Sequence, residues 1–514
     1  MIPVLLSRSA ARWGLAVILM CAGTAGIAQA GDYDFKLILD TSGPLKDIPF
    51  APDLNNHGTI AFYAETAEGV PGVFTTDGTS LNAIAMLKDA VPGIGPIGFV
   101  GFEPALNDSG EVALWVSGSF PGNPAIVKGR GGPNRSLTPI AVRTIPGLYS
   151  NLGDCPAINN NGDVLFRAQP AGWGYDYYLD WVLYRGNGTD PVVTIASSQG
   201  LSNEFSRIDS NMPAENNNGA VVFTGWRRDF TGGSSQYGVY VFDGTANRPA
   251  YVPADHIHTF LTTAPDINDK GQVVFYMWSS DQPLEDIYVT TVGGTATKVV
   301  EGDIIDPYTT VGINNNGTIA FCGQVGGVAG LFTGGDPIAD RVISAGDPLG
   351  GSTVVSLAIE RNGLNDLGQM AFRATLADGR AGLFLATPVV RPLPVAIDVK
   401  PGDAANRITL DKDKQVQVAI LSGATFDAST VNLSSVRFGR TGTEDSLVRN
   451  KRGIITFSLA DANGDGRLDL IASAVVAQTG FQPGDTVARL TGTIRDGREL
   501  SGSDTIVVVT SRRR

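Results

Sequence analysis

Apolar and polar positions alternate through a short phrase that returns seven times along the chain. The phrase is an apolar residue, Asn, two unspecified positions, Gly, one unspecified position, two apolar residues and Phe; it first reads Leu54 to Phe62. By subtraction, successive Asn residues lie 52, 52, 57, 52, 46 and 51 positions apart. The copies are marked by Asn55, Asn107, Asn159, Asn216, Asn268, Asn314 and Asn365.

The phrase predicts a tight turn between two strands. Asn followed three residues later by Gly is typical of a type I turn, and period-2 apolar spacing, as in Val164 and Phe166, predicts a half-buried strand. The position four after Gly is Phe in six copies and Leu114 in the second, which predicts one buried layer per repeat. The residue before Asn is apolar in six copies, and Glu215 is the exception.

Each repeat is predicted to form a four-stranded propeller blade, because a period of 46–57 residues is too long for a single-strand coil. The seventh repeat lacks a fourth strand, since a Pro-rich stretch begins at Pro388. We expect Tyr33–Asp40 to supply it, which removes an open sheet edge. The predicted fold is therefore an all-β, seven-bladed β-propeller over residues 31–388, closed by its N-terminal strand.

The ends of this domain are marked by composition. Arg8 and Arg12 precede an apolar run and a small-residue cleavage site at Ala28–Ala30, so residues 1–30 are predicted to be a signal peptide. No later apolar run reaches the roughly 18 residues that a membrane helix needs. Residues 389–394 are predicted to be a Pro-rich linker and residues 395–514 a small C-terminal β-sandwich. We expect an exported protein, periplasmic or extracellular.

Composition and charge limit the classes of partner that we expect. The 64 Gly and 29 Pro suit many short strands joined by turns. The formal charge is −13, or −15 once Arg8 and Arg12 leave with the signal peptide, so we expect no nucleic-acid partner. Cys155 and Cys322 fall in separated repeats, and we expect no disulfide between them. A monomer is expected.

One loop in the C-terminal domain has the spacing of a calcium site. Oxygen-bearing side chains stand at positions 1, 3, 5 and 9, a backbone carbonyl is available at 7, and Gly466 permits the bend at 6. Position 12 is Ala472 instead of the Glu of an EF-hand. We predict a structural Ca²⁺; the alternative is a tight turn made by local side-chain bonds. The candidate ligands are Asp461, Asn463, Asp465, Arg467 and Asp469.

Two resemblances follow from these motifs. Residues 31–388 resemble the bacterial NxxGxxAF tandem-repeat proteins, whose consensus is matched outright by Asn314 to Phe321. That resemblance implies an exported, β-propeller-like protein of unassigned role. Residues 395–510 are similar to a C-terminal module common in exported bacterial multidomain proteins, on the strength of Ile397–Gly402, Val436–Gly439 and Pro483–Thr486. This second resemblance implies an accessory β-domain.

The candidate ligand-binding residues lie between the second and third strands of their repeats or in the crossings between repeats. Aromatic rings with a few polar partners suit a sugar or peptide surface, although some could instead fill gaps between blades. Two of the residues are histidines, spaced to share a metal or to act in acid–base chemistry. The set is Trp115, Trp173, Tyr175, Tyr177, Trp226, Arg227, His256, His258 and Trp278.

No catalytic residue is identified, because the sequence shows no nucleophile elbow, Cys–His pair or phosphate loop. We expect a non-enzymatic binding or scaffold protein whose loop face binds an unknown glycan or protein. The alternatives are a propeller hydrolase or lyase acting on polysaccharide, with acidic residues and His256/His258 at the central opening, and a structural surface protein. An enzyme should show two or three titratable groups converging at that opening with perturbed pKa values.

Overall fold

The computed structural model of the chain forms two compact units, the first ending at Thr387 and the second beginning at Pro388. The predicted signal peptide lies outside the described residues, as do Trp173, Tyr175, Tyr177, His256 and His258. The described residues are 33–119, 123–132, 135–143, 148–171, 181–198, 204–209, 212–229, 234–254, 259–261, 264–279, 285–302, 304, 310–389, 392–424, 426–495 and 497–511.

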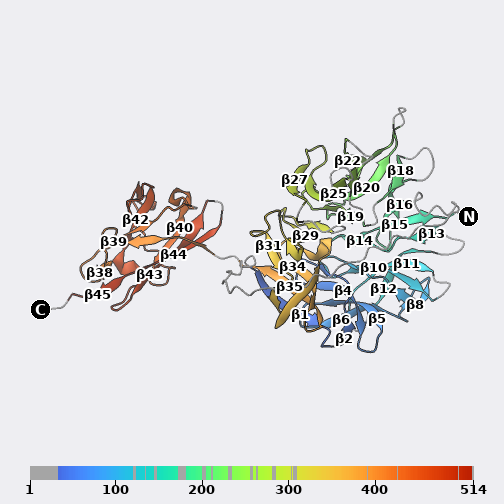
Figure 1. The fold of residues 1–514 in the computed structure, drawn as a ribbon, viewed down its shortest axis with the longest axis horizontal. Helices are drawn as coiled ribbons and strands as arrows, with labels where there is room; N and C mark the ends of the chain where they lie inside the picture. The colour runs from blue at the N-terminus through green and yellow to red at the C-terminus, as the bar shows by residue number, and fades with distance from the viewer. Residues whose placement is uncertain are drawn as a thin grey trace, which may run out of the picture. The chain divides into compact units, whose positions relative to one another are not determined.

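The described part of the first unit contains seven sheets of four to six strands. Figure 1 shows them following one another around a common centre, which makes this unit propeller-like. In repeat order, the sheets contain β2 (Leu45–Asp47), β3 (Asp53–Leu54), β4 (Ile60–Thr66), β5 (Pro71–Thr76), β6 (Leu81–Met86); β7 (Ala90–Val91), β8 (Gly95–Val100), β9 (Ala105–Leu106), β10 (Val112–Gly118), β11 (Pro124–Gly129), β12 (Leu137–Val142); β13 (Tyr149–Leu152), β14 (Ala157–Ile158), β15 (Val164–Pro170), β16 (Val182–Gly186), β17 (Val193–Ser197); β18 (Phe205–Ile208), β19 (Ala214–Glu215), β20 (Val221–Arg227), β21 (Gln236–Phe242), β22 (Asn247–Tyr251); β23 (Thr259–Leu261), β24 (Asp266–Ile267), β25 (Val273–Ser279), β26 (Glu285–Thr290), β27 (Thr297–Val300); β28 (Val311–Ile313), β29 (Ile319–Val325), β30 (Val328–Phe332), β31 (Arg341–Ser344); and β1 (Tyr33–Asp40), β32 (Pro348–Leu349), β33 (Ser352–Ala358), β34 (Met370–Leu376), β35 (Ala381–Pro388).

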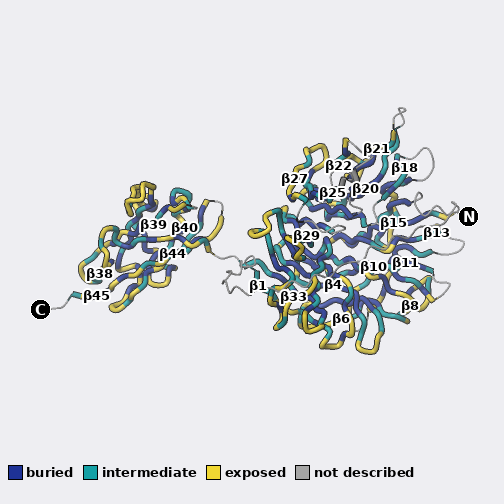
Figure 2. The backbone as a smooth tube through the Cα atoms, in the orientation of Figure 1, coloured by how far each residue is buried: buried dark blue, intermediate teal, exposed yellow. Residues whose placement is uncertain are grey.

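The repeated Phe forms the predicted buried layer. The seven side chains at this position are 0% exposed, and Figure 2 shows the buried stretches on the inner strands. Each packs between its own sheet and the preceding one: Phe62 in the first sheet, for example, shares a cluster with Ala371 and Leu383 of the last sheet. Burial of one large apolar side chain per repeat therefore holds neighbouring sheets together. The layer is Phe62, Leu114, Phe166, Phe223, Phe275, Phe321 and Phe372.

The Asn-x-x-Gly turn forms as predicted. In the sixth repeat, Asn314 Oδ1 accepts hydrogen bonds from the backbone N–H groups of Asn316 (3.0 Å) and Thr318 (2.9 Å). The carbonyl of Asn314 also accepts from the N–H of Gly317 at 3.0 Å. Gly317 has φ +86°, in the left-handed region that a side chain disfavours, which explains why Gly recurs at this position.

The N-terminal strand lies where the sequence predicts it. Strand β1 is the edge strand of the last sheet, beside β35. Its end is held by a hydrogen bond from the Thr41 N–H to the Ala381 carbonyl (2.9 Å) and by an ion pair between Arg380 and Asp40 (2.7 Å). Phe35 packs edge-on against Phe372, with ring centroids 6.2 Å apart. The first strand of the described chain thus completes the sheet of the seventh repeat.

The second unit has two four-stranded sheets and one two-stranded sheet around its own core. Their strands are β36 (Leu393–Pro394), β44 (Glu499–Thr505), β43 (Val487–Ile494) and β40 (Val431–Gly439); β37 (Ile397–Val399), β39 (Gln415–Ile420), β42 (Asp469–Val475) and β41 (Phe457–Ala460); and β38 (Arg407–Thr409) with β45 (Val507–Val509). The 3₁₀ turns are η1 (Arg361–Gly363) in the first unit and η2 (Ala428–Thr430) and η3 (Val476–Gln478) in the second.

The predicted linker 389–394 needs correction at its end, because Leu393–Pro394 forms β36 and pairs in parallel with β44. Before β41, Asn450 Oδ1 accepts from the N–H groups of Arg452 and Ile454 and closes a local turn, beside which Ile455 pairs with Arg449 as an isolated bridge.

Across the part of the chain that the structure describes, no helix is long and apolar enough to cross a membrane.

Candidate functional site

The repeated Asn side chains link each repeat to the next around the centre. Asn55 Nδ2 donates to the carbonyl of Asn107 at 3.1 Å, and the same bond recurs from six of the seven Asn residues. The third repeat differs, since Asn159 Nδ2 donates to Oε1 of Glu215 at 3.0 Å. One side chain thus forms the turn through its oxygen and joins the neighbouring sheet through its nitrogen.

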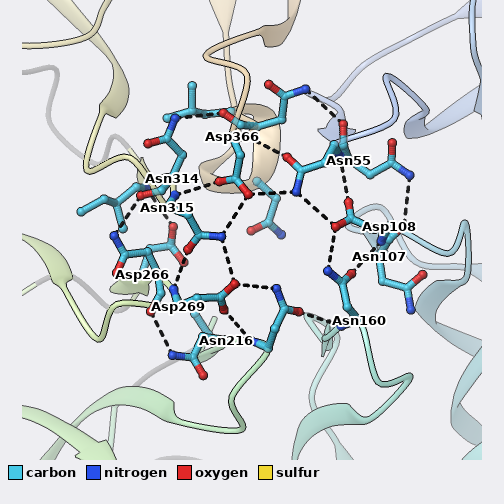
Figure 3. Close-up of a pocket in the computed structure, with 18 of the residues that line it drawn as sticks. Asn55, Asn107, Asp108, Asn160, Asn216, Asp266, Asp269, Asn314, Asn315 and Asp366 are labelled. Atoms are coloured by element: carbon cyan, nitrogen blue, oxygen red, sulfur yellow. Dashed lines mark hydrogen bonds between the residues drawn. The ribbon is translucent and has the colours of Figure 1, made fainter. Parts of the chain in front are cut away.

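The residue after each Asn forms a second ring (Figure 3). Its backbone N–H donates to the side-chain Oδ1 of its counterpart in the next repeat, at 2.7–2.8 Å in all seven steps. Each of the three carboxylates also accepts from two Asn amides, at 2.7–3.1 Å. The members of this amide–carboxylate ring are Asn56, Asp108, Asn160, Asn217, Asp269, Asn315 and Asp366.

A cavity of about 160 Å³ lies among these residues. Its polar groups are largely bonded to one another, so the charge of each carboxylate is met by amide donors. Among the described residues, no group of three His, Cys, Asp or Glu side chains is arranged to hold a metal ion. We interpret the amide–carboxylate ring as the structural closure of the first unit.

Carboxyl groups gather in a second, smaller cavity, which we call the carboxyl pocket. It is lined by Asp53, Glu103 and Glu360, together with Cys155 and Arg361, and its volume is about 20 Å³. The three acids come from three repeats, each from the few residues that precede the repeated Asn. The innermost strands are interrupted there, as between β8 and β9, and the intervening residues can point inward.

Hydrogen bonding distinguishes the three acids. Asp53 is 5% exposed, and its Oδ2 accepts from Asn362 Nδ2 (3.0 Å) and from the Leu106 N–H (3.3 Å). Glu360 Oε2 accepts from the Thr310 hydroxyl at 3.5 Å. Oε2 of Glu103 is buried and has no hydrogen-bond partner among the described residues. Glu103 therefore offers an acceptor that a ligand could satisfy.

Burial and mutual repulsion raise the pKa of two of these groups. Burial first, and then the charges of Glu103 and Asp53, raise the pKa of Glu360 to about 8 against the opposing charge of Arg361. Burial also raises the pKa of Asp53 to about 7, against the Asn362 hydrogen bond and the charge of Arg361. Glu360 is therefore mostly protonated at neutral pH and can give up a proton there.

Arg361 crosses the centre of the first unit. Arg361 is 4% exposed, and its guanidinium donates hydrogen bonds to the carbonyls of Pro213 (2.9 Å), Pro265 (3.3 Å) and Met212. Those carbonyls belong to the fourth and fifth repeats, whereas Arg361 belongs to the seventh. Arg361 lines both the ring cavity and the carboxyl pocket, so it lies between them and supplies positive charge to the buried acids.

A larger cavity of about 310 Å³ adjoins the carboxyl pocket, and we call it the aromatic pocket. Its walls include Phe99, Phe102, Trp115 and Trp181, and Glu103 lines both cavities. The Arg167 guanidinium lies over the Trp181 ring, 4.1 Å from its centroid. The combination of aromatic faces with a carboxylate at one end suits a sugar ring.

The residues predicted to bind a ligand have separate surroundings. Trp115 lines the aromatic pocket. Trp226 stacks on Tyr237 with centroids 4.9 Å apart and donates Nε1 to Asp209 at 2.9 Å, while Arg227 pairs with Glu204. Trp278 lies in β25. The sequence does not predict the acids of the carboxyl pocket, because each of the three stands at a different offset from its Asn.

The predicted calcium loop is a tight turn. Asp461 accepts backbone N–H bonds from Gly464, Asp465 and Gly466 at 2.7–3.1 Å. Asp469 is 0% exposed and accepts from the N–H groups of Ser422 and Ala462, both at 2.8 Å. These bonds account for the loop conformation through local contacts. Calcium binding by Asp461, Asn463, Asp465, Arg467 and Asp469 stays a prediction.

Comparison with known proteins gives a family and a set of similar folds. A sequence model described as a family of unknown function, DUF7453, matches residues 24–324. No curated protein matches the chain. Solved structures similar in fold include an oligogalacturonate lyase from Vibrio parahaemolyticus (12% identity, 70% of this chain and 98% of that one, TM-score 0.41) and the polysaccharide lyase Uly1 (10%, 66% and 90%, 0.43). A virginiamycin B lyase from Staphylococcus aureus is similar at 13% identity (69% and 100%, TM-score 0.38).

Proposed function

We propose that this chain, which belongs to the DUF7453 family of unknown function, is an exported hydrolase that acts on polysaccharide. The observation that carries the proposal is the convergence of Asp53, Glu103 and Glu360 on one cavity, with raised pKa values for Asp53 and Glu360. A binding or scaffold protein, the first expectation from the sequence, has no need of three acids held against their own repulsion. Raised carboxyl pKa values are a common feature of catalytic sites.

Each acid has a distinct role in this proposal. Burial, together with the charges of Glu103 and Asp53, raises the pKa of Glu360 and keeps it protonated, so Glu360 gives its proton to the glycosidic oxygen as the carbon–oxygen bond breaks. Glu103, whose Oε2 is free to accept, takes a proton from the water that attacks the anomeric carbon. Asp53 is a positioning residue: it is held by Asn362, and its charge raises the pKa of Glu360.

Hydrolysis fits these residues better than the lyase alternative. A lyase removes a proton next to the carboxyl group of a uronic acid and must stabilise the negative charge that develops there. Arg361, the cation that lines the carboxyl pocket, is engaged with three backbone carbonyls, and the other ionisable residues of the lining are acids and Cys155, none of which can offset that charge. Glycoside hydrolysis instead uses a pair of carboxyl groups, one protonated and one ionised.

The test is release of reducing ends from a panel of polysaccharides. We expect the wild-type chain to cleave at least one of them, and Glu103→Gln and Glu360→Gln each to lose roughly 100-fold or more in rate with unchanged circular dichroism. The matched control is Glu301→Gln, since Glu301 is an exposed acid that lines neither the carboxyl pocket nor the aromatic pocket. No cleavage of any polysaccharide, or equal rates in all variants, would contradict the proposal.

A further inference from the structure

Aromatic side chains form a continuous strip across the first two repeats. Phe50 and Phe102 have ring centroids 4.8 Å apart, and Phe102 and Phe99 are 5.3 Å apart. Tyr63 meets Phe50 and Phe102 edge-on at 5.8 and 5.0 Å, and Trp115 meets Phe99 edge-on at 5.8 Å. We call Phe50, Tyr63, Phe99, Phe102 and Trp115 the aromatic strip.

The strip is a surface and not part of the buried layer between sheets. Phe50, Phe99 and Phe102 are 38%, 44% and 38% exposed, whereas the repeated Phe residues of the core are 0% exposed. Single exposed aromatics are common, but contiguous ones mark an interaction site. Tyr63, at 7% exposure, and Trp115 support the three Phe rings from the protein side and limit their movement.

The strip leads to the proposed catalytic acids. Phe102 directly precedes Glu103 in the chain, and Phe99, Phe102 and Trp115 line the aromatic pocket with it. A ligand that lies along the strip therefore reaches the one acid shared with the carboxyl pocket. A chain of sugar units fits this arrangement, because several rings in a row bind several units of a polymer.

The charges around the strip select the type of sugar. At one end of the strip, the carboxylates of Asp47 and Glu65 interact electrostatically with Tyr63. At the other end, Glu103 and Asp154 line the aromatic pocket. Three cations lie near these four acids: Lys46 is paired with Glu65 at 3.3 Å, Arg373 interacts with Asp47, and Arg167 lies over Trp181. The surroundings are therefore net acidic and disfavour polymers of uronic acids or sulfated sugars.

From this geometry we infer that the aromatic strip binds an uncharged pyranose polysaccharide and delivers it to Glu103. The inference rests on the proposed function and adds its substrate class. The pyranose units place their C–H faces on the Phe rings, and their hydroxyl groups remain in water. The acidic residues around the strip exclude anionic polymers.

The test measures binding with the full chain carrying Glu103→Gln, so that the polymer is not cleaved. Affinity electrophoresis uses soluble neutral polysaccharides, namely hydroxyethyl cellulose, arabinoxylan and galactomannan, beside polygalacturonate and alginate. We expect retardation by a neutral polymer, weakened about threefold to tenfold by Phe50→Ala or Phe99→Ala. Ile338→Ala is the matched control, because Ile338 is 67% exposed in the sixth repeat and should leave binding unchanged.

Two results would overturn the inference: retardation by anionic polymers alone, or neutral binding that both Phe variants retain in full. The failure of the proposed function has a different signature. In that case the wild-type chain binds the neutral polymer through the strip, which supports the inference, but releases no reducing ends.

Discussion

The backbone N–H of Asp366 donates to Oδ1 of Asn56 at 2.8 Å, although 310 residues separate the two. The bond joins the last repeat to the first. Beside it, Asn365 Nδ2 donates to the carbonyl of Asn55 at 3.2 Å, again across 310 residues. The N–H to Oδ1 contact also connects all the other neighbouring repeats, and the Nδ2-to-carbonyl contact connects all of them except the third to the fourth, where Asn159 binds Glu215. The N–H group that follows each repeated Asn is therefore satisfied around the whole circle.

Removal of one such contact should destabilise the first unit. Asn365→Ala loses the bond to Asn55 and leaves the N–H groups of Leu367 and Gln369 without their Oδ1 acceptor. We expect the free energy of unfolding to fall by about 2 kcal/mol or more, measured by urea denaturation. His57→Ala, at an exposed position of the equivalent turn, should change it by less than about 0.5 kcal/mol. Equal losses in both variants would argue against the closing role.

The effect of replacing Glu215 on the free energy of unfolding should depend on Arg185. Its side chain is 0% exposed, pairs with Arg185 at 2.6 Å and accepts the Asn159 amide that elsewhere reaches a backbone carbonyl. Glu215→Leu restores the apolar residue of the other repeats but leaves Arg185 largely buried without its carboxylate, so we expect a loss of about 2 kcal/mol. Val241 in β21 occupies the position of Arg185 in the next repeat. Adding Arg185→Val to the Glu215→Leu variant should therefore recover most of the lost free energy of unfolding. Strictly additive losses in this double-mutant cycle would exclude the coupling.

Stability should fall as the pH rises from 5 to 8.5. Folding raises the pKa of Asp53 to about 7, of Glu215 to about 7 and of Glu360 to about 8, in each case first through burial. Stability from a raised carboxyl pKa is fully present below the ordinary value and is lost as the pH rises through the folded value. We expect the Tm to drop by several degrees across this range, and by less in Asp53→Asn. A Tm that is flat or rises in the wild-type chain would contradict these pKa directions.

Calcium should stabilise the second unit if the predicted site binds it. Asp461 and Asp465 would contribute ligand oxygens, and binding to the folded state alone raises stability by mass action. We expect EDTA to lower the Tm of that unit in the full chain, and added CaCl₂ to restore it. Asp465→Ala should abolish the response. A Tm unchanged by EDTA would mean that the turn bonds of Asp461 hold the loop without a metal.

The repeats could be predicted from the sequence because each depends on local chemistry. Asn314 with Gly317 specifies a turn, Phe321 specifies a buried position, and Tyr33–Asp40 has the pattern of the missing strand. The bond from an Asn amide to the next repeat depends on which segments become neighbours, which periodicity does not reveal. The position after each Asn holds only Asn or Asp in all seven copies, and this restriction is the sequence signal for the amide–carboxylate ring.

The acids of the carboxyl pocket required the structure. Asp53, Glu103 and Glu360 stand two, four and five residues before their Asn, so an alignment of the repeats does not place the three in one column. Asp266 repeats the offset of Asp53, and Asp154 repeats that of Glu360. Only the fold brings these three residues to one cavity, where Arg361 of the seventh repeat reaches across to the Pro213 carbonyl of the fourth. The useful signal is a charged residue, such as Glu103 or Glu360, four or five positions before the repeated Asn, where most repeats have an uncharged residue.

The proposed role of the carboxyl pocket is tested most directly by asking whether Glu360 supplies the proton to the leaving group. The measurement compares Glu360→Gln with the wild-type chain on its polysaccharide and on a dinitrophenyl glycoside of the same sugar, whose leaving group needs no proton. We expect the variant to lose roughly 100-fold or more on the polysaccharide and to stay within about tenfold of the wild type on the activated glycoside. Equal losses on both substrates, or no loss on either, would contradict the proposed role of the carboxyl pocket.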